Sequence, residues 1–307
     1  DSGAPMPLGA DAVIPWADTD RGESRVAIHR AVAAGDNVRR RAEDVKSGTT
    51  VLTRGSRISA RHVALLAGLG LHRVRVRPAP RVVVVSIGDE LVEPGQSREA
   101  GDVFDANGHA LACAVTDAGG QAFRVAAVPD ELRALADTIE DQLVRADVLI
   151  TTGGLSVGQG DTVKDVLAPL GSVRFDAVAM SPGRQLGVGT VEGTPIFCLP
   201  GDPVSAQIAF ETFVRPVLRQ IAGRTSLHRS SLPATISEGW HSPSGKREFV
   251  PVHVSGSPSR GYRAEPTTPP GTVRLHGLSE ANAIAVVPED TSTVVAGDTL
   301  HCLLLDA

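Results

Sequence analysis

Two acidic side chains stand directly behind a glycine at the end of an apolar run. The run Val82-Val-Val-Val85 is followed by the segment 86–91, which reads SIGDEL. Carboxylates in such a turn can hold a cation or carry out acid–base chemistry. They can equally accept backbone N–H groups in an ordinary solvated turn. This segment alone leaves both interpretations open for Asp89 and Glu90.

A glycine-rich segment follows a second apolar run. Residues 151–161 read TTGGLSVGQGD and lie between an expected buried strand and an expected helix. Exposed backbone N–H groups and the helix dipole favour a bound anion at such a place, so we expect a phosphate cradle. The spacing is neither that of a Walker A loop nor that of a dinucleotide fingerprint. Asp161 can cap the helix or hold Mg²⁺ beside the phosphate, and the two roles are compatible.

Two further turns carry groups suited to anions. Residues 199–205 read LPGDPVS, in which proline at a helix start and the glycine before it give a rigid entry with free N–H groups. Residues 180–184 read MSPGR, and Arg184 could bind an oxyanion, although a solvated surface arginine is the commoner outcome.

These turns need elements that bring them together. The apolar periodicity predicts strands separated by helices, which favours parallel pairing with right-handed crossovers and a doubly wound sheet. The expected strands are 82–85, 122–128, 147–151, 173–180 and 195–199. The expected helices are 109–118, 130–144, 161–167 and 203–221, of which the second would be capped by Asp130. In such a sheet ligands bind beyond the carboxyl ends of the strands. The loops above would therefore share one rim.

The flanking segments have a different pattern. We expect a β-rich fragment of an N-terminal domain over 1–40, a helical or linker domain over 41–78, the α/β domain over 79–223 and a β-barrel over 226–307. The first fragment would hold short strands at 12–15 and 25–29, and the second a helix capped by Ser59 and ended by Gly70.

Composition narrows the class of protein. The chain has 307 residues, a net charge of −5 and no long basic run, which argues against a nucleic-acid partner held through phosphates. Its three cysteines, Cys113, Cys198 and Cys302, give neither a disulfide framework nor a metal-ligand spacing. Without a membrane-spanning stretch or a signal peptide, we expect a cytoplasmic protein. The opening residues read like the middle of a domain, so we expect further residues upstream of Asp1.

The loops, taken in order, resemble the molybdopterin molybdotransferase family, which includes MoeA and the gephyrin E domain. That family is known for a TGDEL segment, a GGVSVG..D loop, an MKPGKP..FG loop and an LPGNPVSA turn. Here they stand at 86–91, 153–161, 180–189 and 199–206, and residues 105–107 resemble the family's DSN. The resemblance covers most of the chain and implies a MogA-like, doubly wound, mostly parallel central domain between small β-rich domains, the last of them a β-barrel.

The resemblance also implies a reaction. The family's enzymes are Mg²⁺-dependent transferases that insert molybdate into adenylylated molybdopterin, release AMP and yield molybdenum cofactor, acting as homodimers. Carried over by motif, Glu90 and Asp161 would act as acids and hold Mg²⁺, and Asp44 would be a further catalytic acid. The implied substrate-binding residues are Gly153, Gly154, Ser156, Gly158, Asp105, Asn107, Pro200, Gly201, Asp202, Ser205, Ser181 and Arg184, of which Ser181, Arg184 and Ser205 would lie near molybdate.

The chain departs from the family pattern in several places. Ser181 stands for the first lysine of the KPGK loop, and Arg184 stands for the second. Asp202 replaces the asparagine of the PGNP turn, and the family's serine-containing C-terminal loop reads GTVR here, in which Arg274 could restore a positive charge. The acid of the family's MDGYA segment, expected to act across the dimer, would lie upstream of Ser2.

Three functions are therefore weighed. An active molybdotransferase predicts molybdate binding and activation of a molybdoenzyme apoprotein. A pterin-binding paralogue predicts pterin binding without that activation, and the changes at Ser181 and Asp202 favour it. A non-enzymatic assembly module predicts a stable complex with a partner peptide and neither activity. The sequence does not separate molybdenum from tungsten and does not name the recipient enzymes.

Overall fold

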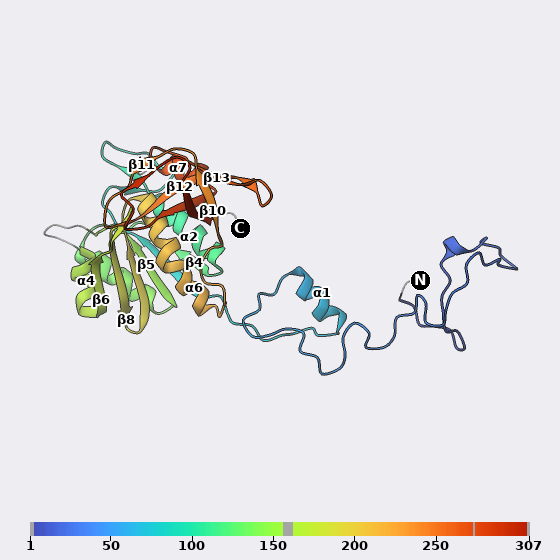
Figure 1. Ribbon diagram of the computed structural model, residues 1–307. Helices are drawn as coiled ribbons and strands as arrows, with labels where there is room; N and C mark the ends of the chain where they lie inside the picture. The colour runs from blue at the N-terminus through green and yellow to red at the C-terminus, as the bar shows by residue number, and fades with distance from the viewer. Residues whose placement is uncertain (1–2, 156–161, 273, 306–307) are drawn as a thin grey trace. The chain divides into compact units, whose positions relative to one another are not determined.

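The computed structural model describes residues 3–155, 162–272 and 274–305 (Figure 1). The chain divides into two compact units, Asp1–Arg54 and Gly55–Ala307. In the described part of the first unit, regular structure consists of the short helix η1 (Trp16–Asp18) and a bridge between Thr19 and Ile28. The prediction of strands at 12–15 and 25–29 is therefore wrong, because these residues form no paired β-strands. Because the described residues 3–54 include no buried side chain, nothing in this unit packs a strand face.

The second unit contains a mixed sheet with the expected parallel core. The strands lie in the order β4-β1-β5-β9-β8-β6. Strands β4, β1, β5 and β9 pair in parallel, β8 is antiparallel to its neighbours β9 and β6, and β6 therefore runs in the same direction as the parallel strands. Their bounds are β1 Arg81–Ser86, β4 Gln121–Arg124, β5 Val148–Thr152, β6 Gly171–Ala177, β8 Gln185–Val191 and β9 Thr194–Leu199. This confirms the doubly wound, mostly parallel α/β class. Strand β8, which is antiparallel to β9, is not among the predicted strands.

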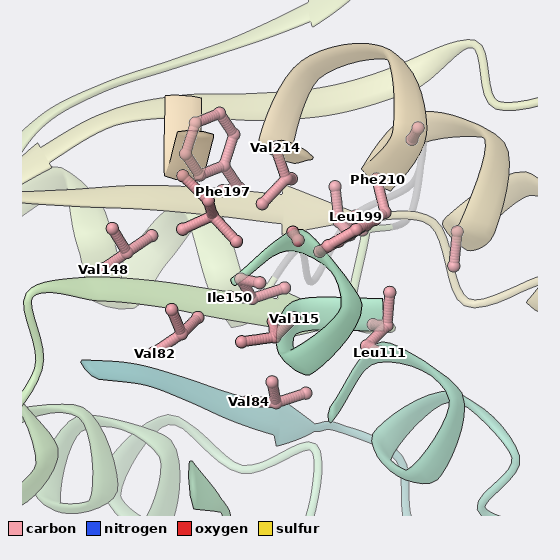
Figure 2. Packing of buried hydrophobic residues seen from close by; sticks show 14 of the residues in the cluster. Val82, Val84, Leu111, Val115, Val148, Ile150, Phe197, Leu199, Phe210 and Val214 are labelled. Carbon is pink, nitrogen blue, oxygen red and sulfur yellow. The ribbon is translucent and has the colours of Figure 1, made fainter. Parts of the chain in front are cut away.

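Helices cover both faces of this sheet. Their bounds are α2 Asn107–Ala118, α3 Leu132–Leu143, α4 Thr162–Leu170, α5 Pro203–Ala209, the π-helix η2 Phe210–Val214 and α6 Arg215–Ile221. Val82 and Val84 of β1 belong to one buried cluster with residues of α2, α5 and α6. Figure 2 shows the two valines together with Leu111 and Val115 of α2. Val83 and Val85 point the other way and pack with residues of α3 and α4. The valine run of β1 therefore contributes to two hydrophobic cores, one on each face of the sheet. Burial of each valine stabilises the fold by about 1.5–3 kcal/mol.

The long helix expected over 203–221 is present but changes its winding. Residues Phe210–Val214 form a π turn between α5 and α6, and Pro216 stands in the first turn of α6. Proline has no N–H to give to a carbonyl one α turn earlier, and its ring crowds that carbonyl. A local widening to a π turn accommodates the proline without ending the helix.

The C-terminal residues form the expected barrel. Strands β12, β13, β10, β16 and β14 pair in that cyclic order, because β13 also pairs with β12. Their bounds are β10 Ser231–Ile236, β12 Arg247–Ser257, β13 Gly261–Pro266, β14 Ala283–Val287 and β16 Thr299–Leu304. Most of the buried side chains inside the barrel are small and aliphatic, and they pack with Trp240 and Cys302. The indole N–H of Trp240 donates to buried Glu248 Oε2 at 2.9 Å.

One short strand ties the α/β domain to the barrel. Strand β7 (Met180–Ser181) pairs in parallel with the start of β12, and the Arg247 amide donates to Ala179 O at 3.0 Å. Met180 packs with Val204 of α5 and with Phe249 of β12. The barrel therefore fixes the position of the loop that follows Ser181.

The remaining elements are short. They are α1 Ala60–Gly68, β2 Leu91–Val92, β3 Val103–Phe104, α7 Leu275–Glu280, β11 Trp240–His241 and β15 Thr293–Val294. In α1 the Ser59 hydroxyl and the His62 ring form a capping box, as the expected cap at Ser59 requires. Across the described helices, none combines the length and the apolar character that a bilayer crossing requires.

Candidate functional site

The carboxyl ends of β1 and β5 and the start of α2 surround a pocket of about 260 Å³. Its walls come from the turn after β1, the segment from β3 into α2, the turn after β5 and the turn before α5. The lining residues are Ser86, Ile87, Gly88, Glu90, Leu91, Val103, Phe104, Asp105, Ala106, Asn107, Asp130, Thr152, Gly153, Gly154, Leu155, Gly201 and Pro203. The position of this pocket follows from the parallel sheet, because such strands present their following loops at one rim.

Glu90 lies on the exposed side of this pocket. The turn from β1 to β2 carries it, and Gly88 gives its side chain room: a Cβ at position 88 would lie 2.7 Å from Glu90 Oε2. The backbone carbonyl of Glu90 accepts from the Val103 amide at 2.8 Å, which ties the turn to β3. An exposed carboxylate at a pocket edge can coordinate a cation or exchange a proton with solvent.

Asp105 is a buried carboxylate with its hydrogen bonds satisfied. It is 1% exposed and accepts from Ser86 Oγ at 2.9 Å and from the Gly108 amide at 2.8 Å. Arg124 Nη1 approaches its second oxygen at 3.4 Å. A charged partner and two donors make the buried charge tolerable. Asp105 therefore holds the end of β1 against the start of α2.

A second carboxylate stands behind Arg124. Arg124 also pairs with Glu93, whose carboxylate contacts the His109 ring at 3.1 Å. Hydrogen bonds from Arg124 are the main cause that holds the pKa of Glu93 below its usual value, and His109 adds to it, while burial opposes the shift. Glu93 thus helps to position Arg124, which in turn pairs with Asp105. The sequence analysis did not single out Arg124 or Glu93.

Asn107 joins three loops at one point. Its Nδ2 donates to Thr152 Oγ1 at 2.8 Å and to Gly201 O at 2.8 Å. Thr152 Oγ1 in turn donates to Pro200 O at 2.8 Å. The start of α2, the end of β5 and the turn after β9 are thereby fixed to one another.

Asp130 is a lining residue that the sequence analysis placed elsewhere. It was expected to cap the helix over 130–144, but α3 begins at Leu132, its N-cap position is Glu131, and neither side chain makes a capping bond there. Instead, the Asp130 amide donates to Asp89 Oδ1 at 3.0 Å, and Asp130 lines the pocket. The sequence feature that could have predicted this role is the position of Asp130 in the loop after β4. Strand β4 lies next to β1 in the sheet.

Two glycine-bearing turns approach closely. Gly153 and Gly201 both line the pocket, and a Cβ at position 201 would lie 3.5 Å from Gly153 Cα. A Cβ on Gly153 would lie 2.2 Å from Ile87 O, and the residue has φ of +89°, so this position requires glycine. Gly154 also lines the pocket, whereas Ser156, Gly158 and Asp161 lie outside the described residues.

The anion-binding turns expected around molybdate lie near one another. Asp202 caps α5 by accepting from the Ser205 amide at 2.8 Å. A Cβ on Gly183 would lie 3.1 Å from Ser205 O, so the loop after Ser181 reaches the start of α5. Ser205 is buried, Ser181 is half-buried and Arg184 is exposed. Pro200, Asp202, Ser205, Ser181 and Arg184 do not line the pocket described above.

The remaining expected acid, Asp44, is exposed and belongs to the first unit. Among the residues that the structure describes, no group of three or more His, Cys, Asp or Glu side chains could hold a metal ion. Among the described residues, the charged side chains that line the pocket are all acidic, namely Glu90, Asp105 and Asp130. This part of the rim suits cations and hydrogen-bond donors better than bare anions.

Comparison with known proteins gives one consistent result. Residues 83–220 match a family described as "Probable molybdopterin binding domain". Residues 1–70 match the MoeA N-terminal region (domain I and II), and residues 233–305 match the MoeA C-terminal region (domain IV).

Similar proteins cover the chain almost completely. Molybdopterin molybdenumtransferase 2 of Mycobacterium tuberculosis is 39% identical over 98% of this chain and 75% of its own length. Molybdopterin molybdenumtransferase of Bacillus subtilis is 29% identical over 99% of this chain and 72% of its own. The crystal structure of a molybdopterin biosynthesis MoeA protein from Pyrococcus horikosii superposes with a TM-score of 0.81 at 28% identity, covering 98% and 74% of the two chains. With this agreement over all its parts, the chain belongs to the MoeA family of molybdopterin molybdenumtransferases.

Proposed function

We propose that this protein is a transferase that inserts molybdate into adenylylated molybdopterin and releases AMP, completing molybdenum cofactor. The observation that carries the proposal is the joining of three strand-end loops at the acidic pocket, through Asn107, Thr152 and Gly201. This geometry occurs in a chain 39% identical to a molybdopterin molybdenumtransferase over nearly its whole length.

The proposal assigns roles to the residues that share this rim. Asp105 and Asn107 position the loops, Gly153, Gly154 and Gly201 allow close approach of the substrate, and Ser205 lies at the helix start where an oxyanion is favoured. From the family pattern, Ser156, Gly158, Pro200 and Asp202 join the substrate site, and Ser181 and Arg184 face molybdate.

Magnesium is part of the proposal. Glu90 is an exposed oxygen donor at the pocket edge, and Asp130 is a second carboxylate in the lining. Hard oxygen donors of this kind fit Mg²⁺, which binds through one or two carboxylates together with phosphate oxygens and water. Glu90 and Asp161 would hold the ion, with Asp44 as a further acid. When bound, Mg²⁺ would offset the negative charge of the phosphoanhydride.

Dimerisation and location are further parts of the proposal. None of the described residues 3–54 is buried, which supports packing of this unit against other protein surface, and a second copy of the chain is the occupant that the family pattern implies. Cys113 and Cys302 are free thiols, which supports a reducing cytoplasm. Light scattering during gel filtration would test the homodimer directly.

The decisive experiment is reconstitution. The chain is incubated with adenylylated molybdopterin, molybdate and Mg²⁺, and AMP release and activation of a molybdoenzyme apoprotein are measured. Both are expected, with a full-length relative as the positive control. If the control is active and this chain gives neither product, the proposal is wrong.

A second function is favoured by two substitutions. Ser181 and Asp202 make the molybdate side less positive than the family pattern, which suits a pterin-binding paralogue without metal transfer. That function predicts pterin binding by calorimetry together with no activation in the reconstitution assay.

A further inference from the structure

Four arginines gather around the end of α6. They are Arg215 and Arg219 of α6 together with Arg224 and Arg229 of the segment that follows, and we call them the arginine cluster. Arg215 and Arg219 are one helical turn apart, and the Arg224 amide donates to Arg219 O at 2.9 Å. Arg215 and Arg229 meet at the carboxylate of Glu211, at 3.3 Å and 2.8 Å. The backbone and a shared ion pair therefore hold the cluster together.

Two helices separate the arginine cluster from the acidic pocket. Pro203 at the start of α5 lines that pocket, whereas Arg219 lies near the end of the continuous helix formed by α5, η2 and α6, roughly 24 Å along its axis. Helix α2 likewise begins at Asn107 in the pocket lining and ends at Gly119 beside the cluster, where a Cβ on Gly119 would lie 2.9 Å from Arg224 Nη2. The cluster is therefore separate from the proposed substrate site.

Two members of the cluster carry N–H groups without a hydrogen-bond partner among the described residues. Arg215 is 7% exposed, and its Nε and Nη1 atoms are buried and unpaired, as is Nε of Arg224. Glu211 Oε2 stands 3.3 Å from Arg215 Nε, which makes an ion pair without the geometry of a hydrogen bond. Buried guanidinium groups left in this state are unfavourable, and native proteins seldom keep them without a compensating ion.

The negative charge around the cluster is too small to balance it. Glu211 is held by Arg229 through two hydrogen bonds, so the guanidiniums of Arg215, Arg219 and Arg224 remain. The C-terminal ends of α2 and α6 oppose them, each equivalent to about half a negative charge, which leaves roughly two positive charges. Among the described residues, the only carboxylate that acts on the pKa of Arg215 is Glu211, and none acts on that of Arg219. Burial is the main cause that lowers both pKa values, and repulsion between the arginines adds to it.

The partial burial of the cluster favours a small ion over a macromolecule. Arg215 is buried and the other three side chains are half-buried, so they do not project toward a flat protein face. The net charge of −5 disfavours a nucleic acid. Arg219 and Arg224 keep the exposure that a ligand needs, whereas Arg215 acts on a ligand through its charge. Planar guanidinium groups fit the oxygens of a phosphate group.

We propose that Arg219 and Arg224 bind a doubly charged oxyanion of the phosphate class, with Arg215 adding its charge from the buried side. The site is a second one, independent of the proposed function. The shared chemistry of its ligands is a tetrahedral group with two negative charges, carried either by the free ion or by a phosphate monoester. The bound group would supply the negative charge that the surrounding protein lacks.

Calorimetry with inorganic phosphate tests the site at about pH 8, where phosphate is doubly charged, with sodium chloride at equal ionic strength as the blank. Arg219→Gln and Arg224→Gln should each weaken phosphate binding about tenfold, because each removes a hydrogen bond between charged groups. Arg133→Gln is the matched control, since Arg133 is exposed and lies on α3, which covers the opposite face of the sheet. Unchanged binding in both cluster variants overturns the proposal. A loss confined to Arg184→Gln would place the ion at the substrate rim and overturn it too.

A second measurement uses the unmodified chain and so decides the proposal even where a variant does not fold. Phenylglyoxal modifies accessible guanidinium groups, and mass spectrometry of the peptides gives the rate at each arginine. Phosphate, compared with chloride at equal ionic strength, should slow the modification of Arg219 and Arg224 several-fold and leave Arg133 unchanged. Equal rates in the two salts overturn the proposal. Glycerol 3-phosphate distinguishes the sources of the ligand: stronger protection than by phosphate supports a phosphorylated metabolite, and weaker protection supports the free ion.

Discussion

Asp202 Oδ1 accepts a hydrogen bond from the backbone N–H of Ser205 at 2.8 Å, closing the first turn of α5. The residue that adds a negative charge relative to the family's PGNP turn is therefore also the helix cap. Asparagine and aspartate cap helices about equally well, so the charge and the cap can be separated by substitution.

Asp202→Asn should keep the free energy of unfolding within about 0.5 kcal/mol, whereas Asp202→Ala should lower it by about 1 kcal/mol. Both variants should bind molybdate more tightly than the unmodified chain at low ionic strength, because a negative charge near the anion is removed. Since Asp202 is exposed, salt should reduce the gain. Urea unfolding and calorimetry measure the two effects, and weaker binding by the asparagine variant would argue against an anion near this turn.

Glu90→Gln should abolish AMP release while the thermal unfolding temperature stays unchanged. The side chain is exposed and lines the pocket edge, so its loss removes a cation ligand without opening a cavity. Glu131→Gln is the matched control, because Glu131 is also exposed, lies in the same domain and is not part of the lining. Unchanged turnover in the Glu90 variant would exclude it from the chemistry.

Ser181→Lys should tighten molybdate binding by a few-fold, because it places a positive charge on the loop that reaches the start of α5. The same change at Ser172, an exposed position on β6, supplies an equal increase in net charge at a distant edge of the sheet. The comparison isolates the local effect. If both lysine variants gain equally, the loop after Ser181 is not near the anion.

Gly108→Ala should destabilise the protein by about 1–3 kcal/mol through overpacking. A Cβ at position 108 would lie 2.4 Å from Asp105 Oδ2 and 3.0 Å from Ser86 Oγ, inside a buried network. Gly68→Ala in α1 is the control: a Cβ there meets no atom within 4 Å, and alanine favours helix. Urea unfolding should separate the two variants, and equal stabilities would show that the Asp105 network can move aside.

The three thiols should differ sharply in reactivity. Burial raises the pKa of the Cys302 thiol to about 11, and Cys198 is also buried, whereas Cys113 is exposed. Near pH 8 the thiolate fraction of Cys302 is therefore about a hundredfold below that of a free thiol. Iodoacetamide should modify one residue in the folded protein and all three in urea. Cys113→Ser should remove the early reaction, and early labelling of Cys302 would show that the barrel opens.

The sequence predicted the elements whose patterns are strong. The valine run of β1 could hardly be anything other than a strand buried on both faces, and it is one. Strand β8 was missed because Gly187 and Gly189 make it resemble a loop. In the structure these glycines are needed for close approach, since a Cβ on Gly187 would lie 2.7 Å from the Phe175 ring and one on Gly189 would lie 2.0 Å from Ser172 O.

Only part of the candidate site could be predicted from the sequence. Loops at one rim can be inferred from strand order, which is why the Gly153 and Gly201 turns were expected to be neighbours. The support given by Arg124 and Glu93 could not be inferred, because it depends on which long side chains of β4 and of the turn after β2 meet in space. Asp130 was assigned to a helix cap because an acid before a helix usually has that role, and only the position of Glu131 shows otherwise.

The parallel pairing of β7 with β12 has a consequence for how members of this family diverge. The two residues of β7 take their backbone partners from the barrel, so the loop after them is shaped by a domain that is distant in sequence. A chimera that took only its barrel from another member of the family would also change the backbone partners that position this loop. Recombination should therefore keep segments 180–184 and 247–249 from a single parent, and changes in one should be accompanied by changes in the other.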